Sequence, residues 1–259
     1  MSPTLILTLG RWAIDWSQSY TRMVRILVQS GSALVRLAPF NPAIFFVLVR
    51  QLYFTAVQPL TIIAVASLVL GSVTVHLLLR LLIGLGAHQQ IGDFLITAML
   101  HHIAPITCTL IIVLRSGTAV LTEMALMKIN REIDTLRFLS VPVEEYLYLP
   151  RLLAFLIAGP CLSFCFCVIG LLGGFFTLGF LHHITFASYL DRLLAAVEVA
   201  DVLILIAKST IMAGLVCLVA LHRGLSVQRA FTEVPIRLIQ GMIQTVTLLI
   251  AVEVVFNLF

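Results

Sequence analysis

Five long stretches of the chain carry almost no charged residues, and this feature constrains the possible folds more than any other. We place the stretches at residues 56–79, 94–114, 152–181, 202–221 and 238–256. A helix needs about 20 mainly apolar residues to cross the roughly 30 Å hydrocarbon layer of a bilayer. Only 11% of the 259 residues are charged, against about 25% in soluble domains. The sequence therefore predicts an all-α integral membrane protein, a single domain over residues 1–259 with about five transmembrane helices.

The third stretch is longer than one upright helix requires. Its 30 uncharged residues would extend about 45 Å as a straight helix. We expect this helix to break or bend at Pro160, or at Gly170, Gly173 and Gly174, for example in a re-entrant turn at the outer face. Pro105 should kink the second span, because proline has no N–H to donate to the helix.

Residues 11–36 have the pattern of a helix that lies in the membrane interface. Trp12, Trp16, Tyr20, Met23, Leu27 and Leu34 share one helical face, and Arg22, Arg25 and Arg36 lie on the opposite one. Aromatic and apolar residues on one face with arginines on the other are typical of interfacial helices. We therefore expect an N-terminal interfacial helix before the first span.

The positive charges are distributed unequally between the two ends of the apolar stretches. Two of them, Arg80 and Arg192, fall on one side, and twelve fall on the other: Arg11, Arg22, Arg25, Arg36, Arg50, Lys128, Arg131, Arg137, Arg151, Arg223, Arg229 and Arg237. Cytoplasmic loops are enriched in Lys and Arg, so we expect a multi-pass inner-membrane protein with a cytoplasmic N-terminus and a periplasmic C-terminus. The net charge of +4 then reflects topology, and no nucleic-acid partner is needed to explain it.

The longest charged stretch between two apolar segments is residues 115–151. Within it, Leu126, Ile129, Ile133 and Leu136 fall on one helical face, and charged residues surround them. We predict a cytoplasmic helix over residues 122–140, between the second and third spans. A helix of this kind can bind a groove of a partner ATPase, although a solvated loop helix is the commoner explanation of such spacing.

The residues in and around this stretch also follow the order of a family signature. Ala104-Pro105 precedes Arg115, Gly117, Thr118, Ala119 and Glu123, which are followed by Met127, Glu132, Ile133, Leu136, Pro142 and Pro150-Arg151. This order resembles the signature of the MlaE/YrbE permeases, the membrane subunits of ABC-type lipid transporters that work with MCE proteins. The chain departs from the family at His101-His102, where many members have Arg-Glu, and at Leu114 and Ala125, where glycine is usual.

The resemblance implies a permease subunit that moves phospholipid or a related lipid between the inner membrane and a periplasmic MCE-domain protein. It implies two copies of this chain above a pair of ABC ATPase subunits that use ATP and Mg, and it allows a small regulatory subunit on the ATPase. The residues it assigns to ATPase coupling are Glu123, Lys128, Arg131, Glu132, Asp134 and Leu136. Those for a lipid pocket are Leu70, Val73, Leu77 and His102, and those for the structural motif are Arg115, Gly117, Pro105, Pro150 and Arg151.

Enzyme motifs are absent from the sequence. There is no G-x-x-x-x-G-K-[ST] motif for ATP, no H-E-x-x-H and no G-x-S-x-G. The five cysteines lie in apolar runs, where cysteine acts as a small packing residue. We therefore predict no catalytic residue, no bound metal and no cofactor held by this chain.

Two other functions remain open from the residues alone. An intramembrane enzyme could use His101, His102 or His182 with Asp191 or Asp201, although we expect these groups on opposite sides of the second span. A self-contained secondary carrier is the other alternative, and it would usually show an internal repeat.

Individual polar residues and glycines in the spans carry separate expectations. His101 and His102 can act as metal ligands, as a proton site, as pocket groups or in inter-helix hydrogen bonds. Lys208 and Glu253 are expected to extend toward the outer headgroups. Arg115 and Glu123 either anchor the second span against the coupling helix or extend into water. Gly71 and Gly214 are expected at close helix–helix contacts.

Overall fold

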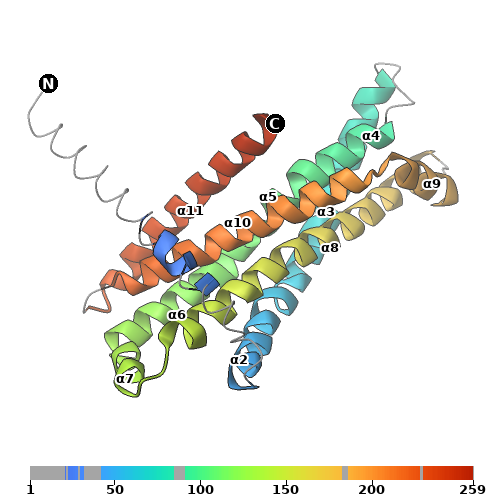
Figure 1. Ribbon diagram of the computed structural model, residues 1–259. Helices are drawn as coiled ribbons and strands as arrows, with labels where there is room; N and C mark the ends of the chain where they lie inside the picture. Colours follow the sequence, from blue (N-terminus) through green and yellow to red (C-terminus); the bar gives the residue numbers. More distant parts are fainter. Residues whose placement is uncertain are drawn as a thin grey trace, which may run out of the picture. The chain divides into compact units, whose positions relative to one another are not determined.

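The computed structural model describes residues 21, 23–28, 30–31, 42–84, 91–182, 186–227 and 230–258. These residues are almost entirely helical and include no strand, which confirms the all-α prediction. The main helices are α2 (Pro42–Leu52), α3 (Leu60–Gly84), α4 (Ile91–Ile96), α5 (Ala104–Ile112), α6 (Thr118–Ile129), α7 (Glu132–Phe138), α8 (Leu149–His182), α9 (Phe186–Ala196), α10 (Val199–Leu225) and α11 (Glu233–Leu258) (Figure 1). Four π-helical turns connect some of them: Tyr53–Val57, Thr97–Ile103, Val113–Gly117 and Glu144–Tyr148.

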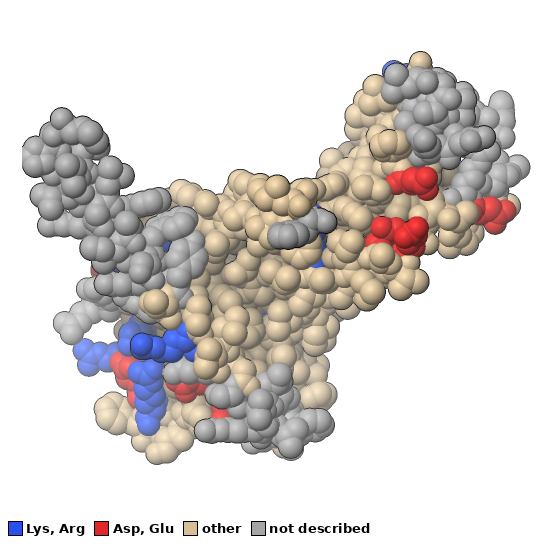
Figure 2. Space-filling model, turned by 45° about the horizontal axis from the view of Figure 1, so that its top comes forward, with Lys and Arg blue, Asp and Glu red and all other residues tan. Residues whose placement is uncertain are grey.

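Five helical segments in the described part of the chain are long and apolar enough to cross a membrane, as the sequence predicts. They are Ile44–Leu81, Gly92–Ile129, Glu144–Phe176, Val199–Leu225 and Glu233–Leu258. Figure 2 shows that, among the described residues, most of the visible surface belongs to residues other than Lys, Arg, Asp and Glu. A surface of this kind needs lipid as its solvent.

The predicted break in the third span is wrong. Helix α8 runs without interruption through Pro160 and through Gly170, Gly173 and Gly174. The glycines allow close contact with a neighbouring helix instead of ending α8: a Cβ on Gly173 would lie 2.9 Å from the Leu68 carbonyl oxygen of α3. Packing against α3 therefore keeps these residues helical, where an isolated peptide would lose helical stability.

Gly71 and Gly214 do lie at close helix contacts, as predicted. A Cβ on Gly71 would collide with the backbone of Gly170 in α8, and one on Gly214 in α10 would lie 3.0 Å from Leu156 Cδ2. Small residues let membrane helices approach closely in this way. These contacts join α3 to α8 and α8 to α10.

Most of the predicted interfacial helix, residues 11–36, lies outside the described residues. Residues 23–28 are helical, and in this short piece Met23 and Ile26 are buried while Arg25 is exposed. The described piece therefore has one buried face, and its exposed residues include Val24, Leu27 and Val28 as well as Arg25.

The helix predicted over residues 122–140 is divided in two, which corrects that prediction. Helix α6 belongs to the same continuous helical segment as the second span, and it ends at Ile129. Arg131 then adopts a left-handed conformation with φ of 60°, and α7 begins at Glu132. A left-handed residue directly after a helix ends it, so α7 forms a separate helix of 7 residues.

The chain divides into two compact units, each with its own buried interior. The first comprises residues 1–51, 117–153 and 217–244, and the second comprises residues 52–116, 154–216 and 245–259. Buried residues of the first include Leu121, Met124, Ile133, Leu149 and Leu221, and those of the second include Ile63, Met99, Leu162, Phe166 and Met212.

In the second unit, α9 packs against α4, and its residues Tyr189 and Leu193 are buried. The Tyr189 hydroxyl donates a hydrogen bond of 3.0 Å to the Leu171 carbonyl of α8. Burial raises the pKa of Tyr189 to about 12, because the charged phenolate is poorly solvated there. The phenol therefore remains a hydrogen-bond donor at neutral pH.

Candidate functional site

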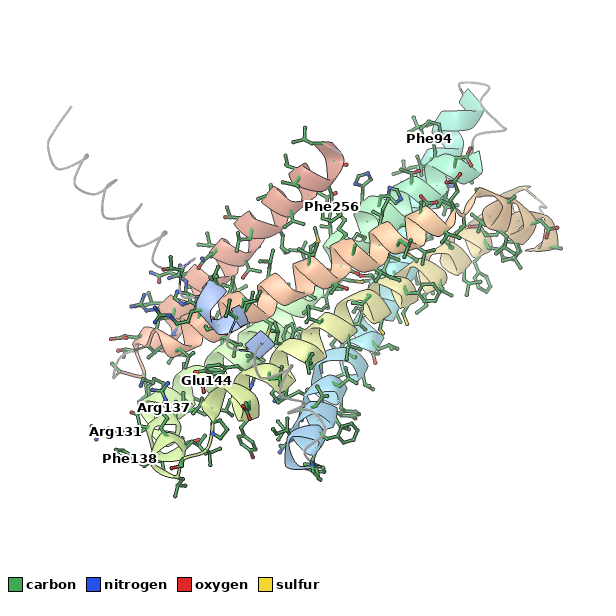
Figure 3. All side chains as sticks on the ribbon, viewed as in Figure 1. Phe94, Arg131, Arg137, Phe138, Glu144 and Phe256 are labelled. Atoms are coloured by element: carbon green, nitrogen blue, oxygen red, sulfur yellow. The ribbon has the colours of Figure 1, made fainter. Side chains whose placement is uncertain are left out.

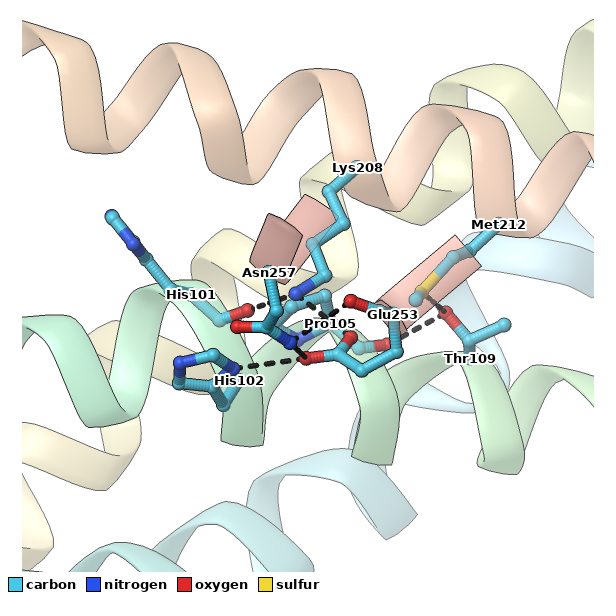
Figure 4. A network of polar contacts seen from close by, with 8 residues as sticks. All are labelled: His101, His102, Pro105, Thr109, Lys208, Met212, Glu253 and Asn257. Carbon is cyan, nitrogen blue, oxygen red and sulfur yellow. Dashed lines mark hydrogen bonds and ion pairs between the residues drawn. The ribbon is translucent and has the colours of Figure 1, made fainter. Parts of the chain in front are cut away.

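A group of polar side chains lies inside the second unit, and Pro105 explains where it forms. In an α-helix the carbonyl of His101 would accept a hydrogen bond from the N–H of residue 105, but proline has none. The helix widens into a π-turn just before this point, so that the Ala104 N–H donates to the Met99 carbonyl. Lys208 of α10 donates its ammonium group to the His101 carbonyl instead (Figure 4). A lysine on a neighbouring helix thus satisfies a backbone oxygen that proline leaves without its α-helical partner.

Lys208 also binds Glu253 of α11. Its Nζ atom lies 2.7 Å from Glu253 Oε2, and the lysine side chain is only 1% exposed. A buried charge is stable only when it is paired and hydrogen-bonded. Both requirements are met here, so this one side chain links the second span, α10 and α11.

The other oxygen of Glu253 accepts two further hydrogen bonds. The His102 ring donates through Nδ1 over 2.9 Å, and Asn257 Nδ2 donates over 3.2 Å. Because an ionised carboxylate only accepts hydrogen bonds, this arrangement requires a proton on His102 Nδ1. Figure 4 shows Glu253 between Lys208 and His102.

His101 binds a different carboxylate, that of Asp201. Its Nε2 atom lies 2.9 Å from Asp201 Oδ1, and the second Asp201 oxygen accepts a 3.0 Å hydrogen bond from the Glu198 N–H. Asp201 therefore fixes the first turn of α10, as acidic residues near helix starts commonly do. His101 and His102 bind separate carboxylates, and no three metal-ligating side chains converge in the described part of the chain.

These contacts correct three expectations for single residues. Lys208 and Glu253 do not extend toward headgroups but bind each other. His101 and Asp201 do not lie on opposite sides of the second span, since they form a direct pair. The sequence alone could not reveal these pairings, because the partners are 45 and 100 residues apart and depend on how the helices pack.

The candidate lipid-contact residues of α3 lie along one exposed stripe. Leu70, Val73 and Leu77 recur at helical spacing and are all exposed, whereas Gly71 and Val75 of the same helix are buried. The buried face contacts α8, since a Cβ on Gly174 would collide with the Val75 side chain. The exposed stripe is thus available for a lipid chain or for another helix.

The candidate coupling residues lie in the first unit, on α6 and α7. Lys128 Nζ lies 3.4 Å from Asp134 Oδ1, and Asn130 Nδ2 donates to Glu132 Oε1 over 3.2 Å. Glu123 pairs with Arg151 of α8 at 2.9 Å. Arg131 and Glu132 are exposed and Leu136 is partly buried.

The apolar face of α7 differs from the one predicted. Ile133 is buried in the interior of its own unit, whereas Phe138 is 90% exposed and Leu139 is exposed. Figure 3 labels Phe138 beside Arg131 and Arg137 at α7. Sequence reasoning missed Phe138 because it extended one helical face across the left-handed residue that separates α6 from α7.

Of the motif residues, Pro105, Arg115 and Gly117 belong to the second span, and Pro150 and Arg151 begin the third. Arg115 Nη2 donates to Gln58 Oε1 over 3.0 Å, and Glu123 pairs with Arg151. Arg115 lies in the π-helical turn Val113–Gly117.

Five helical segments of the described residues are long and apolar enough to cross a membrane, which defines the class of multi-pass membrane proteins. The family model described as Permease MlaE matches residues 48–259. The chain therefore belongs to the MlaE permease family.

Curated relatives agree with this family. The chain is 26% identical over 218 residues to a probable ABC transporter permease protein of Rickettsia typhi, an alignment that covers 83% of this chain and 82% of the relative. It is 29% identical over 177 residues to the intermembrane phospholipid transport system permease protein MlaE of Haemophilus influenzae, an alignment that covers 67% of this chain and 65% of the relative. It is 23% identical over 177 residues to the chloroplastic protein Trigalactosyldiacylglycerol 1 of Arabidopsis thaliana, an alignment that covers 68% of this chain and 51% of the relative.

Proposed function

We propose that this chain is the membrane subunit of an ATP-driven transporter that moves phospholipid between the inner membrane and a periplasmic MCE-type lipid-binding protein. The relative from Haemophilus influenzae is named for intermembrane phospholipid transport, and several relatives are named as ABC transporter permeases. The apolar character of the spans supports a lipid substrate, because a hydrophilic solute would need more polar groups along its path. Leu70, Val73 and Leu77 are proposed to contact the lipid, with His102 at its polar end.

The observation that carries the proposal is the exposed apolar pair at the end of α7. Phe138 and Leu139 lie beside exposed Arg131 and Arg137, and nothing in the described part of the chain covers Phe138. Aromatic side chains surrounded by charged residues are typical anchors of protein interfaces. We propose that this surface, Arg131–Leu139, binds a groove of the partner ATPase.

ATP hydrolysis then belongs to the partner, since this sequence has no phosphate-binding loop. Two ATPase subunits with ATP and Mg, and two copies of this chain, complete the proposed assembly. A small regulatory subunit on the ATPase is compatible with it. The proposed orientation places α7 and the N-terminus in the cytoplasm, where most of the Lys and Arg residues would lie.

The pairing of His101 with Asp201 gives the enzyme alternative its only geometric support. A hydrolytic site would also need a nucleophile beside the histidine. The contacts of His101 in the described residues are with Asp201, Lys208 and the His102 ring, none of which is a hydroxyl or thiol nucleophile. The transport proposal accounts for these residues better, as links between spans.

An affinity-tagged full-length chain, extracted with its native partners in mild detergent, tests the proposal. Mass spectrometry of the purified material should find an ABC ATPase, an MCE-domain protein and bound phospholipid. Phe138→Ala should reduce the recovered ATPase, whereas Phe94→Ala, a matched exposed phenylalanine on α4, should not. Equal recovery with both variants would contradict the assignment of α7 as the docking surface.

A further inference from the structure

The ion pair between Glu123 and Arg151 connects α6 to the beginning of α8. Arg151 Nη2 lies 2.9 Å from Glu123 Oε1, and the arginine side chain is only 3% exposed while the glutamate side chain is 49% exposed. Arg151 Nη1 also donates to the Leu147 carbonyl over 2.8 Å. The arginine is therefore built into the first turn of α8, and Glu123 supplies its charged partner.

Helix α6 is also held tightly by two other helices of the same unit. A Cβ on Gly224 of α10 would lie 2.7 Å from the Leu121 carbonyl oxygen, and one on Gly241 of α11 would lie 2.8 Å from Leu121 Cδ1. Contacts this close leave α6 little room to shift alone, because packed interiors respond to displacement as a body. Glu123 extends this connection from α6 to a third neighbour, α8.

Helix α7 is in turn fixed to α6. The two helices pack against each other, and Lys128 of α6 pairs with Asp134 of α7. A force applied to the exposed end of α7 can therefore pass to α6 through this packing and through the Lys128–Asp134 pair. From α6, the Glu123–Arg151 ion pair leads into the third span.

We propose that Arg151 is a positioning residue of the transport cycle, which makes α6 and α8 move together when the ATPase displaces α7. Glu123 thus acts inside the chain as the partner of Arg151 and not as a contact to the ATPase. This inference rests on the proposed function, because it assigns a path for the force that ATP hydrolysis supplies. Loss of the ion pair lets α6 move without α8, so that ATP is hydrolysed with less lipid moved.

The test compares full-length variants reconstituted with the ATPase in proteoliposomes that contain a fluorescent phospholipid. ATP hydrolysis and phospholipid transfer are measured in the same vesicles. Glu123→Gln removes the negative charge but keeps the size of a half-exposed side chain, so the fold should survive. Asp191→Asn, at an exposed residue of α9, is the matched change of a carboxylate to an amide.

Glu123→Gln should retain ATPase binding within about twofold, the range expected for a change outside a binding surface. The phospholipid moved per ATP should fall about fivefold, a usual size for the loss of one coupled pair. Asp191→Asn should leave that ratio unchanged. Exchange of the two charges, Glu123→Arg with Arg151→Glu, should recover part of the ratio relative to Glu123→Arg alone.

The outcomes separate this inference from the function on which it rests. An unchanged ratio in Glu123→Gln, with ATPase binding intact, overturns the role of Arg151 and leaves the transport proposal standing. Loss of ATPase binding in Glu123→Gln also overturns it, because Glu123 would then be a docking residue. Failure of the unmodified chain to bind any ATPase would remove the transport proposal itself and this inference with it.

Discussion

Replacing Lys208 by methionine removes the cation that binds Glu253 and the donor that binds the His101 carbonyl. Methionine has a similar length and fills the space, so the main effect is a carboxylate left without its cation. Removing one partner of a buried ion pair costs about 3–5 kcal/mol. The Glu253 side chain is 18% exposed, so we expect a loss of about 3 kcal/mol in the free energy of unfolding, near the lower end of that range.

The decisive variant is the double replacement, Lys208→Met with Glu253→Gln. Because glutamine carries no charge, the second change removes the stranded carboxylate, and the double variant should lose only about 1 kcal/mol relative to the unmodified chain. The second change therefore stabilises the first variant, which is the non-additivity expected of residues in contact. Unfolding of the purified full-length chain by SDS in mixed micelles measures all of these free energies.

Two controls make this result specific. Lys208→Arg keeps a cation, so it should lower the free energy of unfolding less than Lys208→Met does. Arg80→Met removes an exposed cation of α3 and should change the free energy of unfolding by less than about 0.5 kcal/mol. If the losses for Lys208→Met and Glu253→Gln simply add in the double variant, the two side chains do not form a buried ion pair.

Three further predictions concern topology, partner and packing. A single cysteine at Asn130, in a background without the five native cysteines, should react with a membrane-impermeant thiol reagent only from the cytoplasmic side; periplasmic labelling would reverse the proposed orientation. The purified chain alone should hydrolyse ATP no faster than a preparation lacking it, and robust turnover would refute the division of labour between permease and ATPase. Gly71→Ala should destabilise the chain by about 1–3 kcal/mol in the same SDS titration, because the added Cβ meets the Gly170 backbone. Gly84→Ala, which meets nothing within 4 Å, should not be destabilising, and equal losses would argue against the α3–α8 contact.

The class of fold could be predicted because it depends on composition along the chain. Five apolar stretches of sufficient length leave few solutions other than membrane-spanning helices, and the described residues contain five such segments. The ends of the helices were harder to predict from the sequence. The second span continues to Ile129 because α6, which carries charges at Glu123 and Lys128, extends the same helix.

The third span shows why breaker residues predict poorly within a packed membrane protein. Gly170 and Gly173 suggested a break, but they remain helical because their missing side chains admit α3. A glycine that allows close approach and a glycine that ends a helix look alike in one sequence. Only the neighbouring helix distinguishes them.

The polar cluster was predictable residue by residue but not as a cluster. His101, His102, Lys208 and Glu253 each stand out in an apolar sequence, and Pro105 marks where a carbonyl loses its usual donor. Their pairing depends on the relative rotation of the second span, α10 and α11, which periodicity does not determine. The exposed Phe138 was missed for a related reason, since its orientation depends on the left-handed Arg131.

Transfer of fluorescent phospholipid from proteoliposomes tests the central claim most directly. The vesicles should contain the full-length chain with its co-purified ATPase, and the medium should contain the MCE-domain partner as acceptor. Transfer should require ATP and Mg, should be lost when the ATPase is omitted, and should fall with Phe138→Ala but not with Phe94→Ala. Transfer that proceeds at the same rate without ATP or without the ATPase would contradict an ATP-driven permease coupled through α7.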